Sequence, residues 1–193
     1  MSIFKSKDTP KVEFLFSEAL RALIDGEKNK SISLLQDVVK KDTNHIRAYL
    51  QLGNILRDEN TDQALKIHQS LTVRPNLLPE QRVEIHAALA KDYIKIGYIK
   101  NAIEEAKKIL SIEKRNLWAL KFLIKISEEN QDWEEAATWS RHLQKISGKK
   151  ILNDLSRFDI YKGLECMRNG NNEDAKSFFK KAVKKSPNNS KPY

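Results

Sequence analysis

The feature that most constrains the fold of this chain is a set of turn residues that recurs at nearly constant spacing. Gly26, Asn60, Gly97, Gln131 and Gly170 lie 34, 37, 34 and 39 residues apart. Self-similarity at such a period is typical of solenoids, in which each unit covers the hydrophobic face of its neighbour. The 193 residues include only six glycines and five prolines, which disfavours a turn-rich β fold. We therefore predict five helix–turn–helix units.

The last unit has the clearest pattern, in the order small, turn, small, aromatic, small and proline: Gly163, Gly170, Ala175, Phe179, Ala182 and Pro187. We expect Gly163 and Ala175 where the two helices cross, because a larger side chain would push them apart. We expect Phe179 to fill the space between hairpins and Pro187 to end the second helix. This order resembles the tetratricopeptide repeat, a helix pair of about 34 residues.

The resemblance to this repeat implies an all-α fold, a right-handed superhelical solenoid of tetratricopeptide-type helix hairpins within a single domain. The predicted units span about 12–43, 44–75, 80–114, 115–148 and 153–187, and residues 188–193 read as the start of a truncated sixth unit. Two joints are longer than the others, at 75–79, where Pro79 can begin a helix, and at 147–150. Repeat arrays normally end in a polar capping helix, and none follows here, so we expect the chain to be part of a longer protein.

The residues that could carry catalysis do not form a recognisable site. The four histidines never fall at metal-ligand spacing, and no glycine-rich phosphate loop is present. We expect His68 and His86, which occupy packing positions of their helices, to be core imidazoles with hydrogen-bond partners. Adjacent acidic pairs are predicted on outer helix faces: Glu104 with Glu105, Glu128 with Glu129, and Glu134 with Glu135. We therefore expect no enzymatic activity, no metal site and no cofactor in this chain.

The candidate binding site is a concave surface, which in this architecture is lined by the first helix of each pair. Residues just off the packing stripe of those helices are predicted to face a ligand: Arg47, Asn54, Arg57, Lys91, Lys95, Trp118, Lys121, Phe122, Lys125, Arg157, Tyr161 and Arg168. The set is mostly basic and includes three aromatic residues, a combination that suits an acidic protein segment. In the alternative interpretation, these lysines are simply solvated helix-face residues.

Nucleic acid is the alternative partner, because the chain has a formal net charge of +9 and a lysine-rich end after Asp174. Repeat proteins that read RNA base by base use a recurring two- or three-residue code at fixed positions. The corresponding residues here differ from unit to unit, which disfavours RNA or DNA as the partner. The lysine-rich end is either a functional basic patch or a solvated outer helix face.

A more specific resemblance covers roughly residues 45–105. Residues 48–57 read AYLQLGNILR, 64–71 read ALKIHQSL, 78–82 read LPEQR and 91–93 read KDY. This succession, with its irregular joint before Glu80, resembles the lipopolysaccharide assembly protein B family of Gram-negative bacteria. Outside this stretch the agreement is in repeat layout only.

That resemblance implies a non-catalytic adaptor at the cytoplasmic side of the inner membrane. Family members help a membrane-bound protease of the FtsH type to degrade the deacetylase that commits lipid A synthesis. They also carry an N-terminal membrane helix and a C-terminal zinc module with paired Cys-x-x-Cys motifs. This sequence has neither, since it has one cysteine and no apolar run near the roughly 20 residues that span a bilayer. We expect a cytoplasmic, protein-binding region that reaches the membrane only through an anchor absent from this sequence.

Overall fold

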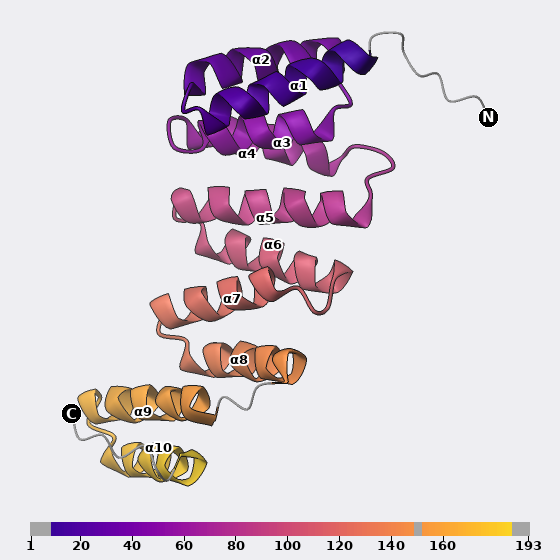
Figure 1. Cartoon of the computed structure of the whole chain (residues 1–193). Helices are drawn as coiled ribbons and strands as arrows, with labels where there is room; N and C mark the ends of the chain where they lie inside the picture. Colours follow the sequence, from indigo (N-terminus) through magenta and orange to yellow (C-terminus); the bar gives the residue numbers. More distant parts are fainter. Residues whose placement is uncertain (1–8, 149–151, 187–193) are drawn as a thin grey trace. The chain divides into compact units, whose positions relative to one another are not determined.

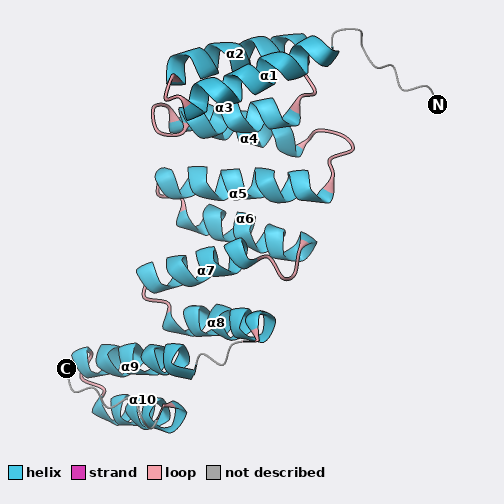
Figure 2. Ribbon diagram, in the orientation of Figure 1, coloured by secondary structure: helices cyan, strands magenta, loops and turns pink. Residues whose placement is uncertain are grey.

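In a computed structural model, described for residues 9–148 and 152–186, the chain forms helices joined by short turns, and the described residues contain no strand (Figures 1 and 2). The helices are α1 (Thr9–Ile24), α2 (Lys28–Lys41), α3 (Ile46–Leu56), α4 (Thr61–Thr72), α5 (Pro79–Lys95), α6 (Ile99–Ile112), α7 (Leu117–Glu129), α8 (Trp133–Ser147), α9 (Leu152–Arg168) and α10 (Asn172–Lys185). The prediction of an all-α fold built from consecutive helix hairpins is confirmed, and α5 begins at Pro79 as expected.

The chain divides into two compact units, residues 1–105 and 106–193, with the boundary inside α6. The exact repeat boundaries stay a prediction. The expected helix end at Pro187, the joint residues Lys149 and Lys150, and the predicted sixth unit at 188–193 lie outside the described residues.

Four of the five predicted turn residues have a left-handed backbone that ends the first helix of a hairpin. The φ angles are 79° at Gly26, 78° at Gly97, 58° at Gln131 and 76° at Gly170. At the third of these hairpin turns, the Asp132 N–H donates to the Ser127 carbonyl at 2.8 Å, and the Gln131 N–H donates to the Glu128 carbonyl at 3.0 Å. This pair of bonds is the Schellman motif, which satisfies the last carbonyl groups of a helix.

The turn between α3 and α4 is different, because Asn60 is not left-handed. Its φ is −146°, and its side chain caps α4 by accepting a hydrogen bond from the Gln63 N–H. The regularly spaced turn positions therefore hold two kinds of residue. Four of them end the first helix of their hairpin, whereas Asn60 caps the start of the second helix of its hairpin.

The first unit has two apolar core clusters, each shared by neighbouring hairpins. Phe16, Leu35, Val38 and Leu52 lie in one cluster that joins the first two helix pairs. A second cluster extends from α3 and α4 to α5 and includes Leu50, Leu71, Ile85, Ala88 and Leu89. Each helix therefore buries one apolar stripe, as expected for helices in a repeat array.

Two glycines allow rings to lie directly on a neighbouring helix. A Cβ atom at Gly53 would be 2.4 Å from Nε2 of His68, and one at Gly163 would be 2.5 Å from Cε1 of Phe179. The ring of Phe179, which we expected between hairpins, therefore lies over Gly163 of its own hairpin. Ala175 is buried in the same hairpin, as expected for a helix crossing.

Candidate functional site

The predicted binding residues lie on α3 and α5 in the first unit and on α7 and α9 in the second. All of these are first helices of their pairs. Four lysines of the predicted set are divided between the units, with Lys91 and Lys95 in the first and Lys121 and Lys125 in the second. We expect them to converge on one stretch of surface, and this convergence stays a prediction.

In the first unit, α3 and α5 enclose a hollow of about 310 Å³. Its lining consists of Arg47, Leu50, Gln51, Asn54, Glu84, Ala87, Ala88 and Lys91. The guanidinium of Arg47 lies 5.3 Å from the centre of the Phe16 ring, a cation–π arrangement that fixes one wall. The hollow is polar and carries two cationic side chains against the single carboxylate of Glu84.

Arg57, also predicted as a groove residue, is instead engaged in an interior charge network. Its Nε donates to Oδ1 of Asp92 at 2.5 Å, and its Nη2 donates to Oδ1 of Asn54 at 2.7 Å. Asp92 is fully buried, and its other carboxylate oxygen lies 2.5 Å from Nδ1 of the fully buried His68. Since a buried carboxylate needs partners on both oxygens, Arg57 and His68 serve mainly to hold Asp92.

His68 is a buried core imidazole, as predicted. The identity of its hydrogen-bond partners was not predicted. Nε2 faces the Leu50 carbonyl at 3.3 Å while Nδ1 faces Asp92, so the ring joins α3, α4 and α5. His86 is similar, with Nδ1 2.6 Å from Oε2 of Glu105. Glu105 is only 7% exposed, so the prediction that it lies on an outer helix face is wrong. The sequence signal for each of these pairs is a histidine and an acidic residue at helix positions that face each other in the core.

Lys95 is held at the surface by an acid of the preceding hairpin. Its Nζ donates to Oδ1 of Asp58 at 3.1 Å. The hydrogen bond and the positive charge of Lys95 lower the pKa of the Asp58 carboxyl below its ordinary value. Lys91 is exposed and lines the hollow between α3 and α5.

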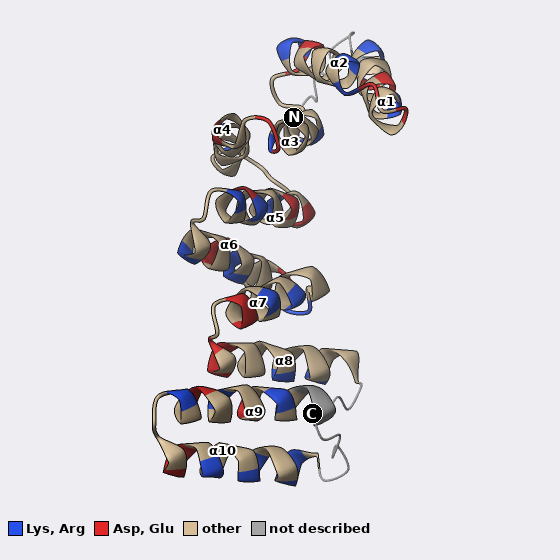
Figure 3. Cartoon of the chain, turned by 90° about the vertical axis from the view of Figure 1, so that its left-hand side faces the viewer, with Lys and Arg blue, Asp and Glu red and all other residues tan. Residues whose placement is uncertain are grey.

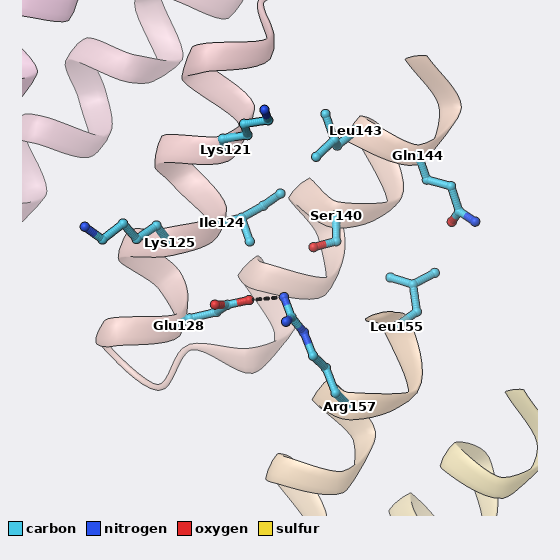
Figure 4. A pocket seen from close by; sticks show the side chains of 9 residues that line it. All are labelled: Lys121, Ile124, Lys125, Glu128, Ser140, Leu143, Gln144, Leu155 and Arg157. Carbon is cyan, nitrogen blue, oxygen red and sulfur yellow. Dashed lines mark hydrogen bonds and ion pairs between the residues drawn. The ribbon is translucent and has the colours of Figure 1, made fainter. Parts of the chain in front are cut away.

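In the second unit, a smaller hollow of about 200 Å³ opens between α7, α8 and α9 (Figure 4). We call it the α7–α9 hollow, and its lining is Lys121, Ile124, Lys125, Glu128, Ser140, Leu143, Gln144, Leu155 and Arg157. Three of the predicted residues, Lys121, Lys125 and Arg157, are brought together here. Arg157 is oriented by Glu128, whose Oε1 accepts from Nη2 at 2.5 Å.

Each of the predicted aromatic residues contacts another ring, one pair being stacked and the other tilted. Trp118 stacks on Phe122 one turn later in α7, with ring centres 5.0 Å apart. Tyr161 of α9 contacts Trp133, the first residue of α8, with ring centres 4.7 Å apart. Tyr161 remains 44% exposed. The aromatic surface is therefore pre-formed by contacts within the unit.

One face of α9 is apolar and exposed. Ile160, Tyr161, Leu164 and Met167 are all exposed by at least 39%. Their spacing places them along one side of the helix, and Arg168 follows directly. Met167 was absent from the predicted set, and its helical spacing from the apolar Ile160 and Leu164, on the same side of the helix as the predicted Tyr161, is the sequence signal that identifies it.

The described lysines of the lysine-rich end are exposed on α10, whereas Lys191 lies outside the described residues. Figure 3 shows an acidic first turn followed by basic segments along this helix. Lys185 pairs with Asp159 at 2.6 Å, and Lys181 lies 4.7 Å from the centre of the Phe178 ring. The order of acids and bases matches the helix dipole, which is a structural reason for the pattern.

A family model described as "Tetratricopeptide repeat" matches residues 162–189. "Lipopolysaccharide assembly protein B" of Escherichia coli strain K12 is 26% identical over 162 residues, covering 83% of this chain and 42% of the relative. The protein of the same name from Haemophilus influenzae is 27% identical, covering 70% of this chain and 36% of the relative. The chain thus spans less than half the length of the curated relatives it matches, and the predicted resemblance to them is confirmed.

Solved structures share the fold at low sequence identity. A crystal structure of MamA protein has a TM-score of 0.62 at 18% identity and covers 93% of this chain and 94% of its own. A tetratricopeptide repeat protein from Parabacteroides merdae has a TM-score of 0.63 at 16% identity, covering 92% of this chain and 68% of its own. Within the described residues, no helix is long and apolar enough to span a bilayer. The chain is a stack of tetratricopeptide-type helix hairpins that is similar in sequence to lipopolysaccharide assembly protein B.

Proposed function

We propose that this chain is the protein-binding region of an adaptor that acts in lipopolysaccharide assembly and has no catalytic activity of its own. The observation that carries the proposal is the similarity to lipopolysaccharide assembly protein B over 83% of the chain. The fold supports it, because helix hairpins of this kind present long surfaces for protein partners. The proposed binding requires no cofactor.

The finer role proposed is to promote proteolysis of a biosynthetic enzyme. In this proposal, the adaptor brings the deacetylase of lipid A synthesis to an FtsH-type membrane protease at the cytoplasmic face of the inner membrane. This role follows from the family resemblance. It requires a membrane anchor outside this sequence.

The proposed contact surface consists of first-helix side chains that are basic or aromatic: Arg47, Asn54, Lys91, Lys95, Trp118, Lys121, Phe122, Lys125, Arg157, Tyr161 and Arg168. Lysine and arginine outnumber acidic residues in the lining of both hollows, which favours an acidic partner segment. Charge would steer the encounter, and the exposed aromatic and aliphatic groups on α9 would supply much of the binding energy.

The test reverses Lys91, Lys95, Lys121 and Lys125 to Glu and measures binding to the purified deacetylase and protease. We expect loss of binding, with helicity checked by circular dichroism. A matched control reverses four exposed lysines on second helices, Lys41, Lys100, Lys180 and Lys184, and produces the same change in net charge. The control should bind like the parent.

Two results would redirect the proposal. Equal affinity of the parent and the first variant would place the partner site away from the first helices. Tight binding of RNA or DNA that weakens log-linearly with salt would favour the nucleic-acid alternative.

A further inference from the structure

In the fourth hairpin the large side chain lies on the first helix and the small one on the second, which is the reverse of the fifth hairpin. This reversal accounts for the α7–α9 hollow. In the fifth hairpin, Gly163 on the first helix accommodates the ring of Phe179 on the second. At the same spacing in the fourth hairpin, the first helix carries Ile124 and the second carries Ser140. The short serine side chain leaves the space beside α8 open, and both residues line the hollow.

The packing of α8 agrees with this explanation. Among its residues, only Ala136 is fully buried, and Leu143 lies half-buried at the edge of the hollow. The facing helix α7 buries six residues, including Leu120, Leu123 and Ile124. The apolar side of α8 is therefore incompletely covered by the described part of the second unit.

The chemistry of the hollow is divided between an apolar floor and a basic rim. Ile124, Leu143 and Leu155 supply aliphatic groups from three different helices (Figure 4). The lining has three cations, Lys121, Lys125 and Arg157, and the single anion of Glu128, which pairs with Arg157. Lys125 also pairs with Glu129, which lies outside the lining, at 3.6 Å. At about 200 Å³ the hollow is smaller than the roughly 300–1,000 Å³ of small-molecule pockets, so its size suits one side chain of a larger ligand.

We propose that the α7–α9 hollow receives one large aliphatic side chain, such as leucine, from an acidic segment of the partner protein. The aliphatic group would occupy the floor formed by Ile124, Leu143 and Leu155. Carboxylates on either side of it in the partner sequence would meet Lys121 and Lys125 at the rim. This inference rests on the proposed protein-binding function and assigns to it an anchor position and a partner sequence type.

The experiment uses the full 193-residue chain with labelled methyl groups and a capped probe peptide, Gly-Ser-Glu-Asp-Leu-Glu-Asp-Ser-Gly. We expect the probe to shift the NMR signals of the Ile124, Leu143 and Leu155 methyl groups. A probe with alanine in place of leucine should bind roughly tenfold more weakly, because it loses the burial of the leucine side chain. A probe with lysine in place of all four acids should not bind.

The matched protein variants fill the hollow or leave it open. Ser140→Leu should occupy the space from within and weaken binding of the leucine probe about tenfold, without lowering the thermal midpoint of the protein. Ser140→Met is the second filling variant, since an unbranched side chain adapts to an irregular gap. Thr138→Leu is the control, because Thr138 is exposed on the same helix and does not line the hollow.

Several outcomes would overturn the inference. It fails if the leucine and alanine probes bind equally, if both Ser140 variants bind like the parent, or if the acidic probe binds nowhere on the chain. None of these results decides the proposed adaptor function, which is judged separately by capture of the deacetylase and protease. Loss of that capture in the charge-reversed protein, together with full capture by Ser140→Leu, would retain the adaptor and reject the anchor position.

Discussion

Gly53 lies so close to the imidazole of His68 that a single methyl group there should destabilise the protein. A Cβ atom at this position would be 2.4 Å from Nε2 and 2.7 Å from Cε1 of the ring. The ring cannot move away freely, because it is fully buried and its Nδ1 lies 2.5 Å from Oδ2 of Asp92. Gly53→Ala must therefore shift the helices apart or break the contact with Asp92.

The size of the effect follows from three contributions. Overpacking a core contact costs roughly 1–3 kcal/mol. Loss of a hydrogen bond to the buried carboxylate of Asp92 adds about 1–3 kcal/mol. Replacing glycine by alanine inside a helix stabilises the folded state by about 0.5–1 kcal/mol, which offsets part of this loss. We expect Gly53→Ala to lower the free energy of unfolding by about 1–5 kcal/mol, measured by urea denaturation with circular dichroism.

Two comparisons isolate the cause. Gly163→Ala creates a similar clash with Phe179, but that ring is only half-buried and forms no side-chain hydrogen bond, so it can rotate at a loss of about 1 kcal/mol or less. In a His68→Ala background the clash disappears, and Gly53→Ala should then stabilise the helix by about 0.5–1 kcal/mol. The reasoning is refuted if Gly53→Ala has the same effect with and without the His68 ring.

Two further predictions concern the helix crossing of the fifth hairpin and the surface ion pairs. Ala175→Leu should destabilise by roughly 1–3 kcal/mol and lower the thermal midpoint, because Ala175 is buried where α9 meets α10; an unchanged midpoint would mean that the repeat register is wrong. Lys95→Gln should raise the pKa of Asp58, and Lys162→Gln that of Glu134, because each lysine lowers its partner's pKa by a hydrogen bond and by its charge. Both carboxyls have lowered pKa values in the folded state, so any stability they add is present above the unfolded pKa and is lost as the pH falls through the folded one. NMR titration of the carboxyl signals checks this, and unchanged values after substitution would contradict it.

The sequence predicted the helix hairpins well because turn and capping residues act locally. A left-handed residue followed by a helix start needs no information from distant parts of the chain. The position of Gln131 shows this, since its place in the repeat predicted a turn although the residue itself does not favour positive φ. Asn60 occupied the expected position for another local reason, as the cap of α4.

The charged residues were harder to assign because their partners are distant in the sequence. Arg57 and Asp92 lie 35 residues apart and meet only when α3 and α5 pack together. Helical periodicity places Arg57 near the binding surface and cannot distinguish an exposed guanidinium from one engaged with a buried acid. Glu105 was misplaced for the same reason, because its partner His86 belongs to the other helix of the hairpin.

The α7–α9 hollow also depends on residues that are distant in the sequence, namely the side chains that the two helices of a hairpin carry at matching positions. Positions fifteen or sixteen residues apart in the sequence, one on each helix of a hairpin, hold Ala19 and Leu35, Gly53 and His68, Ala90 and Ala106, Ile124 and Ser140, and Gly163 and Phe179. Three pairs place the larger side chain on the second helix, and only the fourth places it on the first. Because helix crossings need the two side chains to fill a shared space, either order preserves the hairpin. The reversed order removes bulk from α8 at the side that faces α9, which is where the α7–α9 hollow opens. The residue type at each single repeat position therefore predicts the helix hairpin. The α7–α9 hollow is predicted only when matching positions on the two helices of the hairpin are compared.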